Sequence, residues 1–231
     1  MGAHLDNPIW AALTTDHAHL ALGGDRARRY PAEIGPLSGI SAETAASYDA
    51  LRPLAGPGGL VGLFLREAPQ LPERWTLVRG GALDQMVAER PELVGAEPGV
   101  PMRRLTAADA PAMVELAELT NPGPFRLRTI ELGAFFGIVD GGRLLAMAGQ
   151  RLRFPGFVEV SGVCTRPDAR GRGYARLLMS RVMEEIVREG RTPFLHTYAH
   201  NEAAIRVYRS LGFVPRRSFE LAVVQAERPA G

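Results

Sequence analysis

The chain has 231 residues and a formal net charge of only +2, with 46% hydrophobic and 23% charged residues. These proportions are those of an ordinary globular protein, and they exclude a highly charged, disordered chain. The small net charge gives no reason to expect a nucleic-acid partner. A single cysteine, Cys164, excludes an internal disulfide, and no spacing of cysteine and histidine indicates a metal site.

The N-terminus lacks a basic stretch followed by a long apolar run, and no segment approaches the length of a membrane span. We therefore expect a cytoplasmic protein without a membrane partner. Every positively charged side chain is arginine, because the sequence contains no lysine. This excludes a lysine base or a Schiff base.

The first part of the chain is predicted to alternate short strands with helices. A short helix is expected within residues 1–16, strands at 18–22, 26–30, 37–40, 60–65, 75–78 and 83–88, and a helix from 41 to about 53. Residues 90–101 contain three prolines and two glycines and form the best linker. We therefore expect two domains, at 1–98 and 102–231.

The second part is predicted to be a mixed α/β segment. Expected elements are strands at 102–105, 135–139, 143–154, 157–163, 192–197 and 219–224, and helices at 106–119, from 175 onward and at 201–213. Thr106 and Asp109 resemble a capping box. Asp140-Gly141-Gly142 is the strongest hairpin signal in the chain. The fold class is therefore α+β, built on a mixed sheet.

A glycine-rich turn, Arg170-Gly171-Arg172-Gly173-Tyr174-Ala175, joins an apolar strand to a helical pattern. The first amide groups of a helix have no internal partner and lie at the positive end of its dipole. Glycines let the backbone approach a phosphate oxygen closely. The turn therefore predicts an anion site. A nucleic-acid contact by Arg-Gly-Arg-Gly would need repeats in a disordered segment, which this sequence lacks.

The spacing Arg170-x-x-Gly173-x-Ala175 resembles the acyl-CoA loop of the GNAT N-acetyltransferase superfamily. Downstream, Asn201-x-x-Ala-x-x-x-Tyr208-x-x-x-Gly-Phe follows in the order that this superfamily shows. The resemblance covers about residues 102–225 and implies a GNAT fold there, with acetyl-CoA as co-substrate and no metal. It places the CoA pyrophosphate on the loop residues Arg170, Gly171, Arg172, Gly173, Tyr174 and Ala175.

The same resemblance suggests roles for single residues. The main chain of Val163 and Thr165 would pair with the pantetheine, and Tyr208 would protonate the departing thiolate, unless it only packs on its helix. Asn201 would contact the cofactor or simply cap the helix. Glu131 would contact the acceptor.

The resemblance also suggests Glu159 as the catalytic base, because histone acetyltransferases of this superfamily carry a catalytic glutamate at that place in the strand, and apolar neighbours would raise its pKa. The alternatives are a salt-bridged or edge-exposed acid, and a reaction without a dedicated base in which protons pass through water. His196 and His200 are weaker candidates. Cys164 is expected to be a packed core residue and not a nucleophile.

The two halves of the chain show an internal similarity. Leu20-Ala-Leu-Gly-Gly-Asp-Arg-Ala-Arg28 aligns without gaps to Leu145-Ala-Met-Ala-Gly-Gln-Arg-Leu-Arg153, and 37–40 corresponds to 160–163. This predicts a degenerate GNAT-like N-terminal half that has lost its CoA loop, unless the similarity is chance. The arrangement is similar to the glycine N-acyltransferase branch of the superfamily.

The sequence therefore predicts an acyl-CoA-dependent N-acyltransferase. The expected reaction moves acetyl from acetyl-CoA to a primary amine of a small molecule by direct attack, without an acyl-enzyme. The alternative is a non-catalytic acyl-CoA-binding module, against which Tyr208 and the intact loop both argue.

Overall fold

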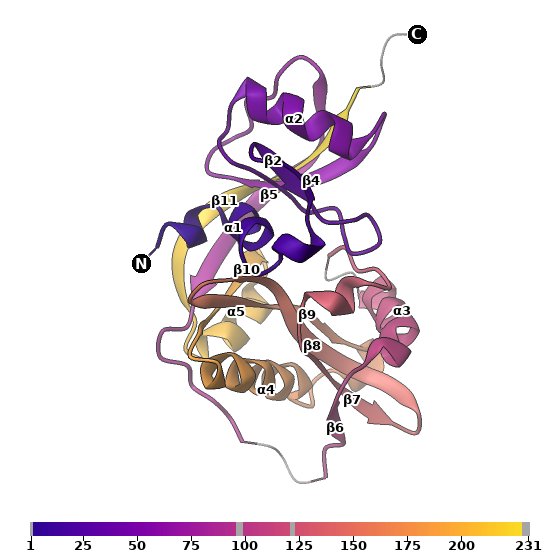
Figure 1. Cartoon of the computed structure of the whole chain (residues 1–231). Coiled ribbons are helices and arrows are strands. Elements are labelled where there is room, and N and C mark those ends of the chain that lie inside the picture. Colours follow the sequence, from indigo (N-terminus) through magenta and orange to yellow (C-terminus); the bar gives the residue numbers. More distant parts are fainter. Residues whose placement is uncertain (1, 96–98, 121–122, 228–231) are drawn as a thin grey trace.

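The computed structural model describes residues 2–95, 99–120 and 123–227 (Figure 1). The helices and short 3₁₀ turns are η1 His4–Asp6, α1 Pro8–Thr14, η2 Ala18–Leu20, α2 Ala45–Ala55, η3 Ala107–Asp109, α3 Ala110–Thr120, η4 Thr129–Leu132, η5 Pro167–Ala169, α4 Tyr174–Arg188 and α5 Glu202–Arg209. Within these ranges, no helix is both long enough and apolar enough to cross a membrane.

The strands are β1 Leu22–Gly23, β2 Ala27–Arg29, β3 Ser38–Ile40, β4 Leu60–Leu65, β5 Trp75–Val87, β6 Met102–Arg104, β7 Phe135–Asp140, β8 Arg143–Phe154, β9 Phe157–Thr165, β10 Thr192–Tyr198 and β11 Val214–Ala226. They form a small sheet, β1-β2-β3, and an eight-stranded sheet in the order β4-β11-β5-β10-β9-β8-β7-β6. In the large sheet β9 and β10 are parallel and the other neighbours are antiparallel. The predicted mixed α/β class is confirmed.

Helices cover both faces of the large sheet in its lower part (Figure 1). Ala146 and Ala148 of β8 pack in one apolar cluster with the buried side of α4. Met147, which alternation directs to the opposite face, packs in another cluster with α3. Strand β8 and its neighbour β9 therefore lie between α3 and α4.

The predicted hairpin between β7 and β8 is confirmed. Asp140 pairs with Arg143, and the two intervening glycines, Gly141 and Gly142, have φ of 54° and 78°. Two central residues with positive φ match the right-handed twist of the flanking strands. The capping box of Thr106 and Asp109 is confirmed as well, since the Asp109 carboxylate accepts from the Thr106 amide at 2.8 Å.

Four predicted elements of the first part differ from the structure. Residues 18–22 form mainly a 3₁₀ turn, and α2 begins after Thr44, whose hydroxyl accepts from the Ser47 amide, and not at Ser41. The strands expected at 75–78 and 83–88 are one continuous strand, β5. Gly80 and Gly81 interrupt the apolar pattern but do not end the strand, because both glycines pair with residues of β11.

The long strands β5 and β11 connect the two halves of the chain. Each lies antiparallel to the other, and each also pairs with a strand of the opposite half, β5 with β10 and β11 with β4. The expected domains 1–98 and 102–231 thus share one sheet. In the first half, Leu37 before β3 makes a parallel bridge to Gly62 of β4, as β9 does with β10. The repeat stays a prediction, and this shared pairing pattern favours it.

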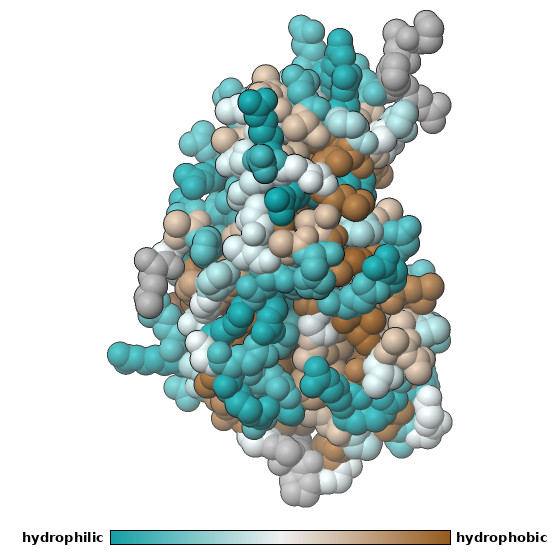
Figure 2. All heavy atoms as spheres, viewed as in Figure 1, coloured by the Kyte–Doolittle hydropathy of each residue, from teal (hydrophilic) through white to brown (hydrophobic). Residues whose placement is uncertain are grey.

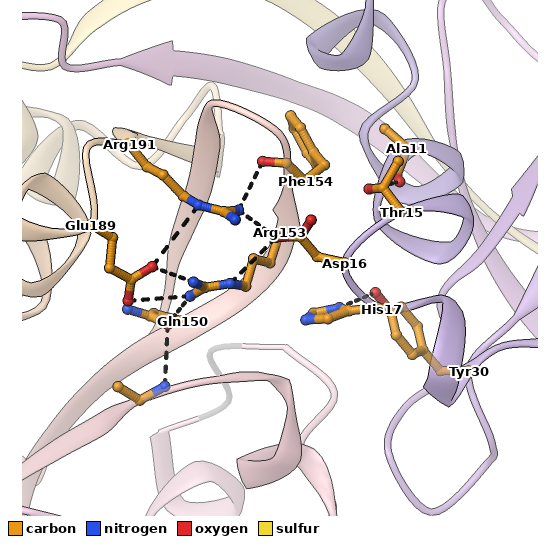
Figure 3. Close-up of polar contacts among 11 residues, drawn as sticks. Ala11, Thr15, Asp16, His17, Tyr30, Gln150, Arg153, Phe154, Glu189 and Arg191 are labelled. Atoms are coloured by element: carbon orange, nitrogen blue, oxygen red, sulfur yellow. Dashed lines mark hydrogen bonds and ion pairs between the residues drawn. The ribbon is translucent and has the colours of Figure 1, made fainter.

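A cluster of ion pairs joins the N-terminal segment to the second half (Figure 3). Asp16, just after α1, contacts Arg153 of β8 at 3.5 Å and also pairs with Arg191 before β10. Glu189, after α4, pairs with Arg153, and Arg191 donates to the Phe154 carbonyl at 3.1 Å. The side chains are partly buried, so these pairs are screened less than pairs on the open surface.

His17 lies buried beside this cluster (Figure 3). Its side chain has almost no exposed surface, and its Nδ1 is 2.8 Å from the Tyr30 hydroxyl. Burial lowers the pKa of His17 to about 4, because the cationic form would lose its hydration, and the nearby His19 adds to the shift. Burial also raises the pKa of Tyr30. Both groups are therefore neutral in the folded protein near neutral pH.

We expect this histidine to weaken the fold in mild acid. Below pH 6.5 an unfolded His17 binds a proton, whereas the folded residue stays neutral until about pH 4. The free energy of unfolding should therefore fall as the pH drops through this window, by up to about 1.4 kcal/mol per pH unit from this group. In urea unfolding at several pH values, His17→Gln should reduce that slope. His19→Gln, at an exposed position, should keep most of it, because burial is the larger cause of the His17 shift, and an equal effect of both variants would contradict the assignment.

Candidate active site

A cleft of about 690 Å³ opens where β9 and β10 separate. These parallel strands pair only from Phe157 with Thr192 to Glu159 with Phe194, and then diverge. One wall is formed by Val160–Val163 of β9 and Leu195–Tyr198 of β10. The other is formed by the N-terminal half, including Phe64, and by β11. Ligands of open α/β sheets bind at the carboxyl ends of the strands in this way.

The surface around this junction is partly apolar. In Figure 2, hydrophobic atoms gather on the right of the molecule, where the upper, N-terminal part meets the lower part. The cleft lining itself mixes apolar groups such as Phe125 and Leu195 with charged and hydroxyl side chains. Such a mixture is typical of small-molecule sites, in which a few polar groups orient the ligand.

The cleft edge of β9 contains a bulge at Gly162. Met147 of β8 pairs with Cys164 and Gly149 pairs with Ser161, so two residues of β9 oppose one residue of β8. Gly162 has φ of 61°, which suits a bulge. Val163 lines the cleft, whereas Thr165 lies at the end of β9 outside the lining. Beyond Glu159 this edge has no strand partner within the described chain, so its main-chain groups are available to a ligand.

The glycine-rich turn has the geometry that the sequence predicts. Gly171 and Gly173 have φ of 79° and 74°, and a Cβ added at either would meet no atom within 4 Å. Gly173 is the N-cap of α4 and provides no side chain to cap it, which leaves the first amides of a 15-residue helix open. Arg170 and Arg172 are exposed and form no ion pair with the described residues.

Tyr208 and Asn201 both reach the cleft from α5. Burial raises the pKa of the Tyr208 phenol, and a hydrogen bond with Thr197 offsets part of that rise. The Asn201 side chain accepts from the Ala204 amide at 3.3 Å, so its predicted capping role is confirmed. Its contact with a cofactor stays a prediction, which its place in the lining permits.

Glu159 is completely buried beneath the cleft floor. Arg151 binds both of its carboxylate oxygens, through Nε at 2.7 Å and Nη2 at 2.6 Å. His196 Nδ1 lies 2.6 Å from Oε1, and the Leu152 amide donates to Oε2 at 3.3 Å. Arg151 and Leu152 of the neighbouring strand β8 and His196 of β10 therefore converge on this single carboxylate.

The expectation that Glu159 has a raised pKa is wrong. Burial alone would raise the pKa, but the Arg151 charge and the hydrogen bonds from Arg151 and His196 hold it at about 2. Such a carboxylate is a poor proton acceptor near neutral pH, and Glu159 is not among the residues that line the cleft. The structure therefore favours the alternative of a salt-bridged acid.

His196 lines the cleft but its ring nitrogens are both occupied. Because Glu159 is ionised, Nδ1 carries the proton, which leaves Nε2 to accept from Gln85 Nε2 at 3.2 Å. Burial lowers the pKa of His196, against the opposing charge of Glu159. The ring is thus a neutral link between Glu159 and Gln85, not an open base.

Two further residues are placed away from the reaction site. Glu131 is exposed on η4 and pairs with Arg128 at 2.7 Å, outside the cleft lining, because η4 turns Thr129 and Leu132 into the core. The prediction that it contacts the acceptor is not supported. Cys164 is buried, and burial raises the pKa of its thiol to about 11, as expected for a packed residue.

The charged groups of the cleft were missed by the sequence reasoning. They are Arg79, Glu118, Arg126 and Arg151. A signal existed for Arg151, since an arginine and Glu159 face each other on neighbouring predicted strands. No local signal marks Arg79, which reaches the cleft through the pairing of β5 with β11. Within the described residues, no group of three or more His, Cys, Asp or Glu side chains could hold a metal.

The buried carboxylate allows a test of its role. Glu159→Ala leaves the Arg151 charge unpaired at the cleft wall, and we expect a loss of about 3–5 kcal/mol in the free energy of unfolding. Chemical denaturation measures this. The double variant Arg151→Met with Glu159→Leu should recover most of the loss, and Glu131→Ala, from an exposed pair, should cost little. A stable Glu159→Ala protein that had lost only turnover would restore the interpretation as a base.

Comparisons with known proteins agree with this architecture. The FR47-like protein family model matches residues 135–221. A solved structure assigned to the GNAT acetyltransferase family, from Novosphingobium aromaticivorans, is 35% identical, with a TM-score of 0.88 over 98% of this chain and 99% of the other. A GCN5-related N-acetyltransferase from Kribbella flavida shares the fold at 16% identity, with a TM-score of 0.66 over 96% and 95% of the two chains. No curated protein matches the chain.

The full-length likeness includes the N-terminal half, so the shared sheet belongs to the common fold of these proteins and is not an addition to it. The family model extends from β7 into β11 and includes the glycine-rich turn and the strands β9 and β10, which form one wall of the cleft. On this likeness the protein is an enzyme of the acyl-transfer class, and the chain belongs to the GNAT family of N-acetyltransferases.

Proposed function

We propose that this protein transfers acetyl from acetyl-CoA to a primary amine of a small molecule. The observation that carries the proposal is the open helix N-terminus behind Gly173, which follows β9 and the 3₁₀ turn η5 in the chain, β9 being part of one wall of the cleft. A diphosphate bound there would direct the rest of the cofactor along the unpaired edge of β9. Its thioester would then reach the bulge at Gly162.

The residues around the loop supply the binding groups. The amides of Gly173, Tyr174 and Ala175 can donate to phosphate oxygens, and Arg170 and Arg172 add positive charge. The main chain of Val163 can pair with the pantetheine amides. The main chain of Thr165, at the far end of the same strand, would pair with the pantetheine as well.

The proposed chemistry is a direct attack. The amine nitrogen bonds to the thioester carbon, and an amide group at the bulge stabilises the oxyanion that forms. The C–S bond then breaks, and the Tyr208 hydroxyl gives its proton to the departing sulfur. The nitrogen loses its proton to water in the cleft, since Glu159 and His196 are both engaged. The products are an N-acetylated amine and free CoA.

The size and walls of the cleft support a small acceptor. A volume of about 690 Å³ is typical of sites for small molecules, and the N-terminal half encloses it on one side. The degenerate GNAT-like origin of that half, its likeness to the glycine N-acyltransferase branch and a cytoplasmic location are parts of the same proposal. The parallel bridge from Leu37 to Gly62 supports the repeat.

Replacing Gly173 tests cofactor binding. Gly173→Glu adds a negative charge at the helix N-terminus, where the pyrophosphate is proposed to lie, so calorimetric titration should show acetyl-CoA affinity lost. Gly190→Glu is the matched control, because Gly190 also has positive φ, is exposed and has open space around it. The control carries the same backbone strain and should bind acetyl-CoA normally. Equal affinity of the two variants would refute the loop assignment.

Removing the phenol tests the general acid. Tyr208→Phe keeps the ring and its packing but removes the proton, so turnover should fall by about a hundredfold or more while acetyl-CoA affinity stays nearly constant. Steady-state CoA release and calorimetry measure the two quantities. Tyr48→Phe, at a buried tyrosine of α2, controls for the loss of a hydroxyl elsewhere. Wild-type turnover in Tyr208→Phe would reduce Tyr208 to a packing residue.

A further inference from the structure

We propose that the acceptor amine also carries a carboxylate, which binds to Arg151 with help from Arg79 and Arg126. This inference rests on the proposed acetyl transfer, because it concerns the second substrate of the same cleft. All three arginines line the cleft, and they come from three separate parts of the chain. Glu118 is the only carboxylate residue among the lining residues that the structure describes.

Arg151 is a preformed anion-binding group. Its guanidinium has five N–H donors, of which Nε and one on Nη2 are used by Glu159. The remaining donors include both on Nη1, which has no hydrogen-bond partner within the described residues. The side chain is 23% exposed and lies at the cleft wall with its guanidinium carbon 5.8 Å from the Phe64 ring centre.

The buried carboxylate makes this arginine rigid. Glu159 binds the Nε–Nη2 edge of the guanidinium through both of its oxygens and is itself completely enclosed, so Arg151 cannot swing out of the cleft without leaving a buried charge unpaired. An arginine fixed in one orientation loses little conformational entropy when it binds a planar anion. A carboxylate of the acceptor could therefore bind to its free edge in a defined orientation.

Arg79 and Arg126 provide positive charge that Glu159 does not neutralise. Arg79 lies on β5, and Arg126 follows α3. Both side chains are exposed, and neither forms an ion pair with any described residue. Most other groups that line the cleft are neutral, so the three arginines give the cleft a positive charge that would attract an anionic acceptor.

Glu118 complements the arginines. It lies on α3, is exposed, and forms no ion pair within the part of the chain that the structure describes. A carboxylate there attracts the ammonium form of an amine before the amine loses its proton. A ligand with one amine and one carboxylate therefore matches both charges of the cleft. Amino acids and short amino-carboxylates form the chemical class with this pair of groups.

Matched acceptors test the preference. Each amino acid is compared with its own amide, which keeps the amine and the side chain but loses the negative charge. Initial rates of CoA release with acetyl-CoA give kcat/KM for both, expressed per free amine to correct for their different amine pKa values. We expect the acid to be preferred by about tenfold or more, because the amide leaves the arginines without their anion. Added salt should reduce the preference.

Variants of the three arginines test whether these residues cause the preference for the acid over its amide. Arg79→Gln and Arg126→Gln should each lower the acid-to-amide ratio of kcat/KM several-fold. Arg151→Lys keeps a charge opposite Glu159 but loses the planar fork, and it should lower the ratio as well. Arg66→Gln is the matched control, since Arg66 is exposed, forms no ion pair with the described residues and lies outside the cleft. Its ratio should equal that of the wild type.

The outcomes separate this inference from the proposed function. If acetyl-CoA does not bind and no amine is acetylated, the proposed function is wrong. If amides are acetylated as well as the acids or better, the proposed function stands and the carboxylate assignment is overturned. Amines that carry a phosphonate form a further arm, and a preference for them over carboxylates would also overturn it. An unchanged ratio in all three arginine variants would remove the assignment to these residues.

Discussion

The pairing of β5 with β11 is the interaction on which the rest of the structure depends. These two 13-residue strands pair antiparallel with each other, and each also pairs with a strand from the other half of the chain. Because of this exchange, the N-terminal half cannot move away from β10 without breaking a central ladder. The wall of the cleft opposite β9 is therefore as fixed as the sheet, and a side chain such as Arg79 is presented by a strand and not by a loop.

The buried carboxylate Glu159 shows how one neighbour decides a residue's chemistry. A glutamate on an apolar strand suggests a raised pKa, and desolvation does act in that direction. The sign of the shift changes because Arg151 and His196 reach the same two oxygens from neighbouring strands. The carboxylate then serves to orient the groups around it, one of which, Arg151, lines the cleft. A glutamate whose place on its strand suggests a catalytic base can thus be the counter-ion of a neighbouring arginine.

Short sequence patterns predicted most of the features that depend only on residues close together in the chain. The Asp140-Gly141-Gly142 turn, the Thr106 capping box, the turn before α4 and the buried Cys164 all depend on neighbours within a few residues, and the structure has each of them. The continuity of β5 could not be predicted in this way, because its partner β11 lies more than 120 residues away in the chain. The same distance hid Arg79 and Phe64 from the predicted site. Glu131 was misplaced for a similar reason, since nothing near it shows which side of η4 is buried.

The first half shows a physical reason why no second anion site, like the one proposed before α4, is expected in it. The position that would correspond to the CoA loop precedes α2, where the Thr44 hydroxyl accepts from the Ser47 amide. The neighbouring Glu43 carboxylate accepts from the Arg66 amide at 3.1 Å and so places a negative charge at that end of the helix. A helix N-terminus supplied with its own acceptor and its own anion has little to offer a diphosphate. If the halves share an origin, the first has exchanged phosphate binding for packing, and its contribution to the cleft is the wall opposite β9 and β10.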